Sequence, residues 1–195
     1  EIPVIVNLFG EKIEDFVGLA EELKEEVSGI ELNISCPNVE KGGILFSDNP
    51  KLVKDLVREV RKIWNSFLAV KLSPVGPVFE VAKSCERAES DALVVANTYP
   101  ALTVLSFKPL KILKGGLSGP AIKPLTLRLV WELSQRVGLP IIGCGGIITG
   151  KDALEYLICG AKAVQIGTAN LINPKSVAEI MEELEKLLKT YGLSY

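Results

Sequence analysis

Cys36 lies between two asparagines in the segment 33–38 (NISCPN), and these three side chains have the types and spacing of a reaction site. Asn33 and Asn38 can each donate and accept hydrogen bonds, which suits a planar ligand rich in amide groups. A thiol at the edge of such a ligand can act as an acid, a base or a nucleophile. A structural interpretation also exists, because a Pro-Asn pair initiates turns and a single cysteine is often a small buried hydrophobic residue. The rest of the chain must therefore decide between the two.

The chain contains no histidine among its 195 residues. Ser-His-Asp and Cys-His catalysis and HExxH zinc sites therefore cannot come from this sequence. Acid–base chemistry near neutral pH would fall to cysteine, lysine, tyrosine or a carboxylate. The cysteines are widely spaced and form no CxxC pair, so we expect neither a zinc nor an iron–sulfur site; they are Cys36, Cys85, Cys144 and Cys159.

The composition is that of one ordinary globular domain, with 48% hydrophobic residues and a net charge of −2. Because there is no basic excess, nucleic acid is not an expected partner. No apolar run reaches the length of a membrane span, and no secretory or transit segment opens the sequence. We therefore expect a cytoplasmic protein with reduced thiols and no membrane contact.

Short apolar runs alternate with amphipathic stretches along the whole chain. The predicted strands are 3–8, 29–34, 67–72, 91–96, 139–143 and 162–167, and the predicted helices are 11–27, 49–65, 77–89, 123–137, 150–159 and 174–191. Such alternation predicts a parallel sheet with right-handed crossovers, either doubly wound or part of a (β/α)8 barrel. A TIM barrel needs about 250 residues. We expect the last six βα units of such an α/β barrel, with roughly two units missing ahead of Glu1.

Polar or glycine residues follow every predicted strand, where a barrel would gather them at one site. Lys71 ends an apolar strand, so it either points inward to an anionic ligand or extends to solvent at the rim. Glycines let backbone N–H groups approach an anion, and the last two βα loops often bind phosphate. Each glycine pair could also be only a tight turn. The strand-end segments are Asn7, 33–38, 71–74, Asn97–Thr98, 143–146 and 167–168, and 115–120 adds a third glycine loop.

Six motifs in order resemble the class 1 dihydroorotate dehydrogenases over essentially the whole chain. They are NISCPN (33–38), VKLSP (70–74), ANT (96–98), GGLSGPAIKP (115–124), PIIGCGGI (140–147) and AVQIGTA (163–169). Cysteine rather than serine in the first motif resembles class 1, and the forms NISCPNVEKGG and KLSP resemble subclass 1B. The resemblance implies a single FMN-binding barrel domain over residues 1–195 that lacks its first two βα units. It also implies oxidation of (S)-dihydroorotate to orotate in pyrimidine biosynthesis.

The resemblance further implies a role for each matching residue. Cys36 matches the base that removes the C5 proton while a hydride passes from C6 to the flavin N5. Asn33 matches a contact to both FMN and substrate, and Lys71 a positive charge beside the flavin. The remaining matches are Asn38, Asn97 and Thr98 for substrate, and Asn7, Gly119, Gly145, Gly146, Gly167 and Thr168 for FMN. In subclass 1B the barrel is a homodimer or a heterotetramer with a subunit that carries FAD and an iron–sulfur cluster, and NAD+ is the final acceptor.

Three alternatives remain at this stage. A dihydropyrimidine dehydrogenase-like flavin barrel shares the fold and a cysteine acid–base residue. An aldolase or isomerase barrel would bind a phosphorylated ligand and use Lys71 as a Schiff-base lysine. A fragment without catalysis would keep only the core. The segment 99–107 is shorter and more apolar than the usual loop of the family, and six βα units would leave the edges of strands 3–8 and 162–167 unpaired.

Overall fold

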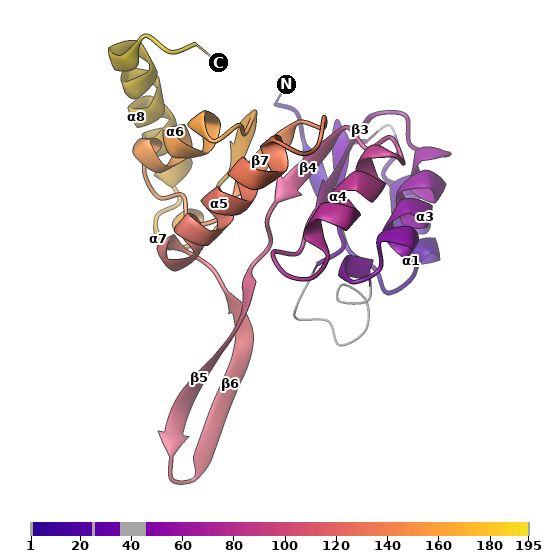
Figure 1. Cartoon of the computed structure of the whole chain (residues 1–195), viewed down its shortest axis with the longest axis horizontal. Coiled ribbons are helices and arrows are strands. Elements are labelled where there is room, and N and C mark those ends of the chain that lie inside the picture. Colours follow the sequence, from indigo (N-terminus) through magenta and orange to yellow (C-terminus); the bar gives the residue numbers. More distant parts are fainter. Residues whose placement is uncertain (1, 25, 36–45, 195) are drawn as a thin grey trace.

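The computed structural model describes residues 2–24, 26–35 and 46–194. Within these ranges six parallel strands form one sheet in the order β1-β2-β3-β4-β7-β8 (Figure 1). The strands are β1 (Ile5–Leu8), β2 (Gly29–Asn33), β3 (Phe67–Lys71), β4 (Ala92–Val95), β7 (Ile141–Cys144) and β8 (Ala163–Gln165). All six predicted strands are therefore confirmed. The sheet curls into a half-barrel, which confirms the predicted α/β class and six units of a TIM barrel.

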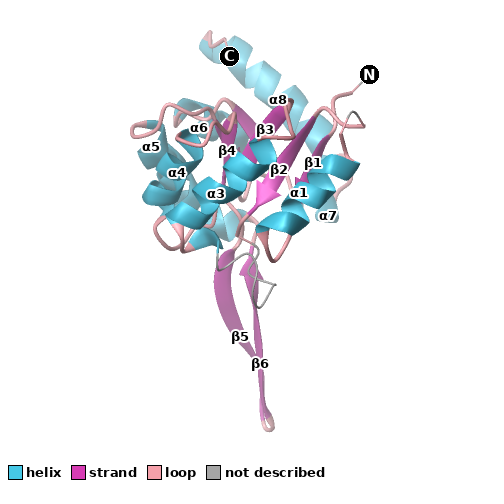
Figure 2. Cartoon of the chain, turned by 90° about the vertical axis from the view of Figure 1, so that its right-hand side faces the viewer, coloured by secondary structure: helices cyan, strands magenta, loops and turns pink. Residues whose placement is uncertain are grey.

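Helices alternate with these strands, and Figure 2 shows α1, α3 and α4 together on one face of the sheet. The six predicted helices all form, although each is shorter than its pattern. They are α1 (Ile13–Glu22), α3 (Pro50–Arg61), α4 (Val78–Glu86), α5 (Lys123–Ser134), α6 (Gly150–Ile158) and α8 (Ser176–Tyr191), with a short α7 (Thr168–Ile172) and a 3-10 turn η1 (Pro120–Ile122) that were not predicted. No helix in the described part of the chain is long and apolar enough to cross a membrane.

Local signals explain where the elements begin and what they bury. The Asn49 side chain caps α3 by accepting from the Leu52 N–H at 3.0 Å, and Pro50 occupies the first turn. One face of α3 then buries Val53, Leu56, Val57 and Val60 against the sheet. Burying each such side chain stabilises the fold by about 1.5–3 kcal/mol. The core between helices and sheet thus holds the strands in register.

A hairpin of two antiparallel strands, β5 (Tyr99–Phe107) and β6 (Leu110–Leu117), projects from the half-barrel (Figure 1). The predicted glycine loop 115–120 is therefore wrong in its first half, because Gly115 and Gly116 pair with β5. Both runs are rich in β-forming residues and are separated by Lys108-Pro109, a signal for a hairpin. Only Ser118 and Gly119 remain in a loop that returns to the body.

The sheet has two outer strands, since β1 pairs only with β2 and β8 only with β7 in the described residues. Apolar side chains at the β1 edge are exposed: Val4 is 53% and Ile5 is 46% accessible. The predicted open edges at strands 3–8 and 162–167 are present in the structure.

Candidate functional site

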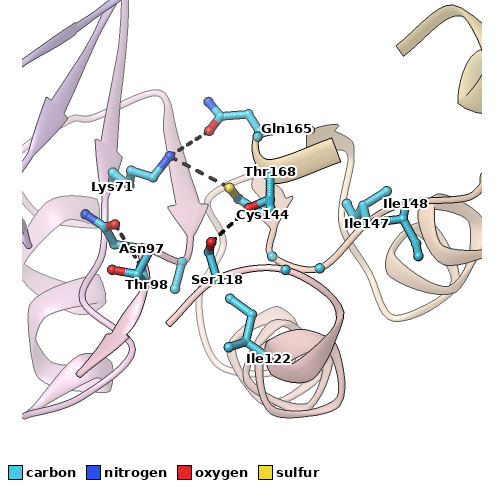
Figure 3. Close-up of a pocket in the computed structure, with 15 residues that line it drawn as sticks. Lys71, Asn97, Thr98, Ser118, Ile122, Cys144, Ile147, Ile148, Gln165 and Thr168 are labelled. Carbon is cyan, nitrogen blue, oxygen red and sulfur yellow. Dashed lines mark hydrogen bonds between the residues drawn. The ribbon is translucent and has the colours of Figure 1, made fainter. Parts of the chain in front are cut away.

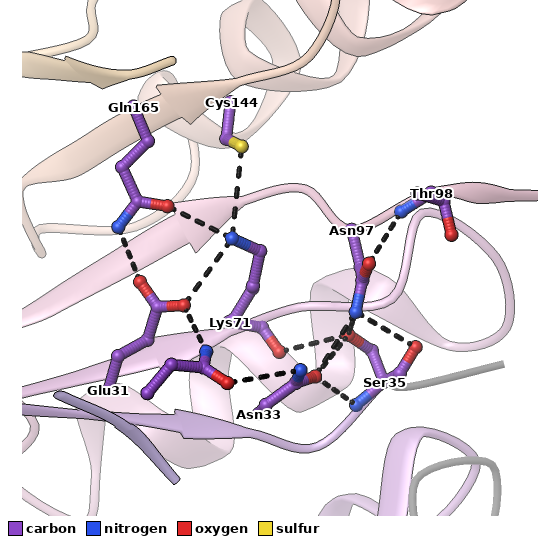
Figure 4. A network of polar contacts seen from close by, with 9 residues as sticks. Glu31, Asn33, Ser35, Lys71, Asn97, Thr98, Cys144 and Gln165 are labelled. Carbon is purple, nitrogen blue, oxygen red and sulfur yellow. Dashed lines mark hydrogen bonds and ion pairs between the residues drawn. The ribbon is translucent and has the colours of Figure 1, made fainter. Parts of the chain in front are cut away.

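The carboxyl ends of the parallel strands bring together side chains that are far apart in the sequence (Figure 4). In the register of the sheet Asn33 pairs with Lys71 and Cys144 pairs with Gln165. Asn7 lies one strand further, on β1. The prediction that the strand ends meet at one site is confirmed for the described residues. Cys36 and Asn38 lie outside them.

Asn97 holds the amide cluster in place. Its Nδ2 donates to Asn33 Oδ1 at 3.1 Å and to Ser35 Oγ at 3.1 Å, and its Oδ1 accepts from the Thr98 N–H at 2.8 Å. Asn33 Nδ2 donates to Asn7 Oδ1 at 3.4 Å, and no other described residue accepts from the second N–H of that amide. Asn33 is therefore the residue with donor capacity, and Asn97 orients it.

Lys71 points inward. Its side chain is only 16% exposed, and its Nζ lies 3.4 Å from Glu31 Oε1, 2.9 Å from Gln165 Oε1 and 3.8 Å from Cys144 Sγ (Figure 4). The alternative of a lysine extended to solvent is thus wrong. Glu31 and Gln165 were missed by the sequence reasoning. A signal existed, because a charged residue in the apolar strand 29–33 is costly unless it has a partner.

A small pocket of about 150 Å³ lies beside this ammonium group, between the strand ends and the loops after β6, β7 and β8 (Figure 3). Its lining includes eight of the predicted residues, namely Lys71, Asn97, Thr98, Gly119, Gly145, Gly146, Gly167 and Thr168. Asn7 and Asn33 line an adjoining hollow that also contacts Lys71.

Gly146 and Gly167 are glycines for different structural reasons. Gly146 has a φ of +69°, and a Cβ there would lie 2.7 Å from Gly119 O and 2.9 Å from Lys123 Cβ. A Cβ on Gly167 would meet nothing within 4 Å. Gly146 is therefore required by the close approach of two loops, whereas Gly167 faces open space at the pocket.

Carboxylate side chains occupy the N-terminus of α6. Asp152 Oδ2 already accepts from the N–H groups of Ile148 and Thr149 at 3.0 and 2.9 Å, and Glu183 accepts from Gly150 N at 2.7 Å. Two carboxylates thus occupy the position where a helix N-terminus attracts an anion. An anion in the pocket would have to rest against the glycine loops instead.

Neither Cys144 nor Tyr156, beside the described pocket, has a pKa low enough to act as a base near neutral pH. Burial raises the pKa of the Cys144 thiol, and the nearby charge of Lys71 offsets this only in part. Burial also raises the pKa of the Tyr156 phenol, whose hydroxyl donates to Gly145 O at 2.7 Å. Both groups therefore favour the protonated form at neutral pH.

A parallel half-barrel with a polar, glycine-lined pocket at its strand ends defines the class of α/β barrels that bind a small ligand there. The comparison with known proteins is more specific. A family model described as dihydroorotate dehydrogenase matches residues 1–188, so the chain belongs to the dihydroorotate dehydrogenase family, as the motifs indicated.

Three relatives illustrate the match. Over 98% of its residues, the chain is 46% identical to a protein of Geobacter sulfurreducens. Over the same share of the chain, the identity to a protein of Geotalea uraniireducens is 47%. The chain is 44% identical to a protein of Bacillus cereus strain AH187 over 100%. Each is named dihydroorotate dehydrogenase B (NAD(+)), catalytic subunit. The chain spans 65% of the length of each of these relatives.

Proposed function

We propose that the chain belongs to the barrel of an FMN-dependent enzyme that oxidises (S)-dihydroorotate to orotate in pyrimidine biosynthesis. The observation that carries this proposal is the pocket itself. Eight of the predicted site residues, from five of the six motifs, line one cavity beside an inward ammonium group, in a chain of the dihydroorotate dehydrogenase family.

The residues present fit FMN. The pocket offers a glycine cradle, in which the open space at Gly167 leaves room for a phosphate, and Lys71 is a cation of its lining. Asn33 has an N–H available, and Asn7 lies beside it. We assign Lys71, Asn7, Asn33, Gly119, Gly145, Gly146, Gly167 and Thr168 to FMN. The flavin, when bound, accepts the hydride that leaves C6 of the substrate.

The substrate contacts in this proposal are Asn33, Asn38, Asn97 and Thr98. Asn97 and Thr98 line the pocket, and the Asn97 amide fixes the direction of Asn33. Cys36 is the proposed base for the C5 proton. Cys36 follows Ser35 in the sequence, and the Ser35 hydroxyl accepts a hydrogen bond from Asn97 Nδ2 at 3.1 Å.

Partners follow from the relatives, which are named as catalytic subunits of an NAD(+)-linked enzyme. We propose a second subunit with FAD and an iron–sulfur cluster, which passes the electrons to NAD+, around a homodimer of barrels in the cytoplasm. An aldolase or isomerase role for Lys71 is disfavoured, because its Nζ is engaged by the Glu31 carboxylate at 3.4 Å and by the Gln165 amide oxygen at 2.9 Å.

Anaerobic mixing of the FMN-loaded protein with dihydroorotate, and separately with dihydrouracil, tests the proposal. We expect loss of flavin absorbance with dihydroorotate alone. Loss with dihydrouracil alone would assign the chain to the dihydropyrimidine dehydrogenase-like alternative, and a protein that takes up no FMN would contradict both assignments.

A further inference from the structure

Glu31 is a buried carboxylate that the proposed mechanism does not use. It lies in the middle of β2, is 3% exposed and is flanked by the fully buried Ile30 and Leu32. Removing an ion from water costs several kcal/mol unless its partners replace the lost hydration. A carboxylate at this depth therefore needs a full set of partners.

The structure supplies these partners from three other strands. Asn7 Nδ2 donates to Oε1 at 2.5 Å, and Lys71 Nζ lies 3.4 Å from the same oxygen. Gln165 Nε2 donates to Oε2 at 2.5 Å. Glu31 thus joins β1, β3 and β8 at the level of the strand ends (Figure 4).

The charges of Glu31 and Lys71 together fix the orientation of the Gln165 amide. A carboxylate only accepts hydrogen bonds, so the NH2 of Gln165 must face Glu31. An ammonium group only donates, so the carbonyl oxygen of the same amide faces Lys71, at 2.9 Å. Lys71 is consequently held from two sides, by the carboxylate and by an amide that the carboxylate orients.

Lys71 and Gln165 line the pocket, whereas Glu31 is not among its lining residues and contacts only the adjoining hollow. Lys71 Nζ donates to Gln165 Oε1 at 2.9 Å and to Cys144 Sγ at 3.8 Å, and it forms an ion pair with Glu31 Oε1 at 3.4 Å. Within the described residues its three N–H groups thus make two hydrogen bonds. The ammonium therefore retains a donor for a ligand, while Glu31 stands behind it.

We propose that Glu31 is a positioning residue that acts through Lys71. It restrains the ammonium group at the pocket wall and offsets its positive charge, and so limits how strongly Lys71 stabilises negative charge on a bound flavin. The part of this inference that concerns the flavin rests on the proposed function, and the part that concerns Lys71 does not.

The first experiment needs no flavin. Trace acetylation of the FMN-free protein, followed by peptide mass spectrometry, measures the reactivity of Lys71 relative to the exposed Lys51. We expect Glu31→Gln to raise this ratio several-fold, because the ammonium loses its counter-ion and one restraint. Glu59→Gln is the matched control, since Glu59 pairs with Lys62 on the surface and should leave the Lys71 rate unchanged. An unchanged Lys71 rate in Glu31→Gln would overturn the restraint.

The second experiment measures the two-electron midpoint potential of bound FMN. Removing the carboxylate while Lys71 remains should favour the flavin state with more negative charge. We expect a change of about tenfold in the reduction equilibrium, which corresponds to about 30 mV upward. In a Lys71→Met background the same substitution should have little effect. A shift that persists in that background, or no shift in the wild type, would overturn the claim that Glu31 acts through Lys71.

The two measurements distinguish a failure of the proposed function from a failure of the proposed role of Glu31. A protein that binds no FMN contradicts the proposed function, and the acetylation ratio still decides on Glu31. If Glu31→Gln did not fold by circular dichroism, Gln165→Met would replace it, because this change removes the amide that Glu31 orients. Its expected effect on Lys71 acetylation has the same direction, and an unchanged ratio would count equally against the proposal.

Discussion

Cys36 carries the proton-transfer step of the proposed reaction. Cys36→Ser should leave FMN bound, because the pocket is lined by other residues, but should slow flavin reduction by dihydroorotate. A hydroxyl is a far weaker base than a thiol near neutral pH, and loss of one positioned base costs about 10²- to 10⁴-fold. Stopped-flow absorbance measures the rate, with Cys159→Ser as the control thiol. Reduction at the wild-type rate would remove Cys36 from the mechanism.

Gly167 allows a clean test of the phosphate position. Gly167→Asp places a negative charge in open space at the pocket, so the fold should be kept while FMN affinity falls at least about tenfold through charge repulsion. Gly18→Asp is the matched control, because a Cβ on Gly18 also meets nothing within 4 Å. Flavin fluorescence titration gives both affinities. Equal affinity in the two variants would place the phosphate elsewhere. Gly146 is unsuitable for this test, since any Cβ there collides with backbone.

At the residue scale the sequence predicted the lining of the pocket better than the contacts behind it. Lys71 and the glycines were recognised because their types are unusual at strand ends. Glu31 and Gln165 were not recognised, because their role depends on a contact between strands β2 and β8. The two residues are 134 positions apart in the sequence. No local pattern contains that information.

At the scale of elements, Thr149 and Asp152 form a capping box that stabilises the start of α6. Burial raises the pKa of Asp152, but hydrogen bonds from Lys123, Ile148 N and Thr149 outweigh it and hold the pKa below its ordinary value. The resulting stability is present above the unfolded pKa of about 4 and is lost as the pH falls through the lower folded value. Thr149→Ala should cost about 1 kcal/mol in unfolding free energy at pH 7.

Asp152→Asn is the pH test of this cap. We expect it to lower the unfolding free energy at pH 7 and to leave a smaller loss between pH 5 and pH 3 than in the wild type, because the titrating group is gone. Urea unfolding at the three pH values measures both effects, and Asp48→Asn serves as a control carboxylate outside the cap. A wild-type pH slope in Asp152→Asn would contradict this account.

Strands and helices were predictable from the sequence where burial produces a regular pattern of apolar residues. The exposed hairpin β5–β6 was less predictable. The inner parallel strands are mostly apolar and buried on both faces, as β3 and β4 show, so their runs are visible in the sequence. The hairpin β5–β6 is exposed along most of its length, with Phe107 83% and Leu110 65% accessible. Its apolar residues follow no buried face, and its glycines were therefore assigned to a loop.

At the scale of the whole molecule, the open half-barrel determines how the chain behaves on its own. Within the described residues the outer strands β1 and β8 each have one sheet partner, and Val4 and Ile5 are exposed at the β1 edge. Exposed strand edges pair with other chains, and a charged side chain at the edge opposes this. We expect residues 1–195 expressed alone to self-associate at micromolar concentration, and Val4→Lys to shift the population toward monomer. Val75→Lys is the control, because Val75 is 45% exposed in a loop away from both edges. Light scattering after size exclusion measures the mass: a monomeric wild-type chain, or equal association of Val4→Lys and the wild type, would contradict association through the edge of β1.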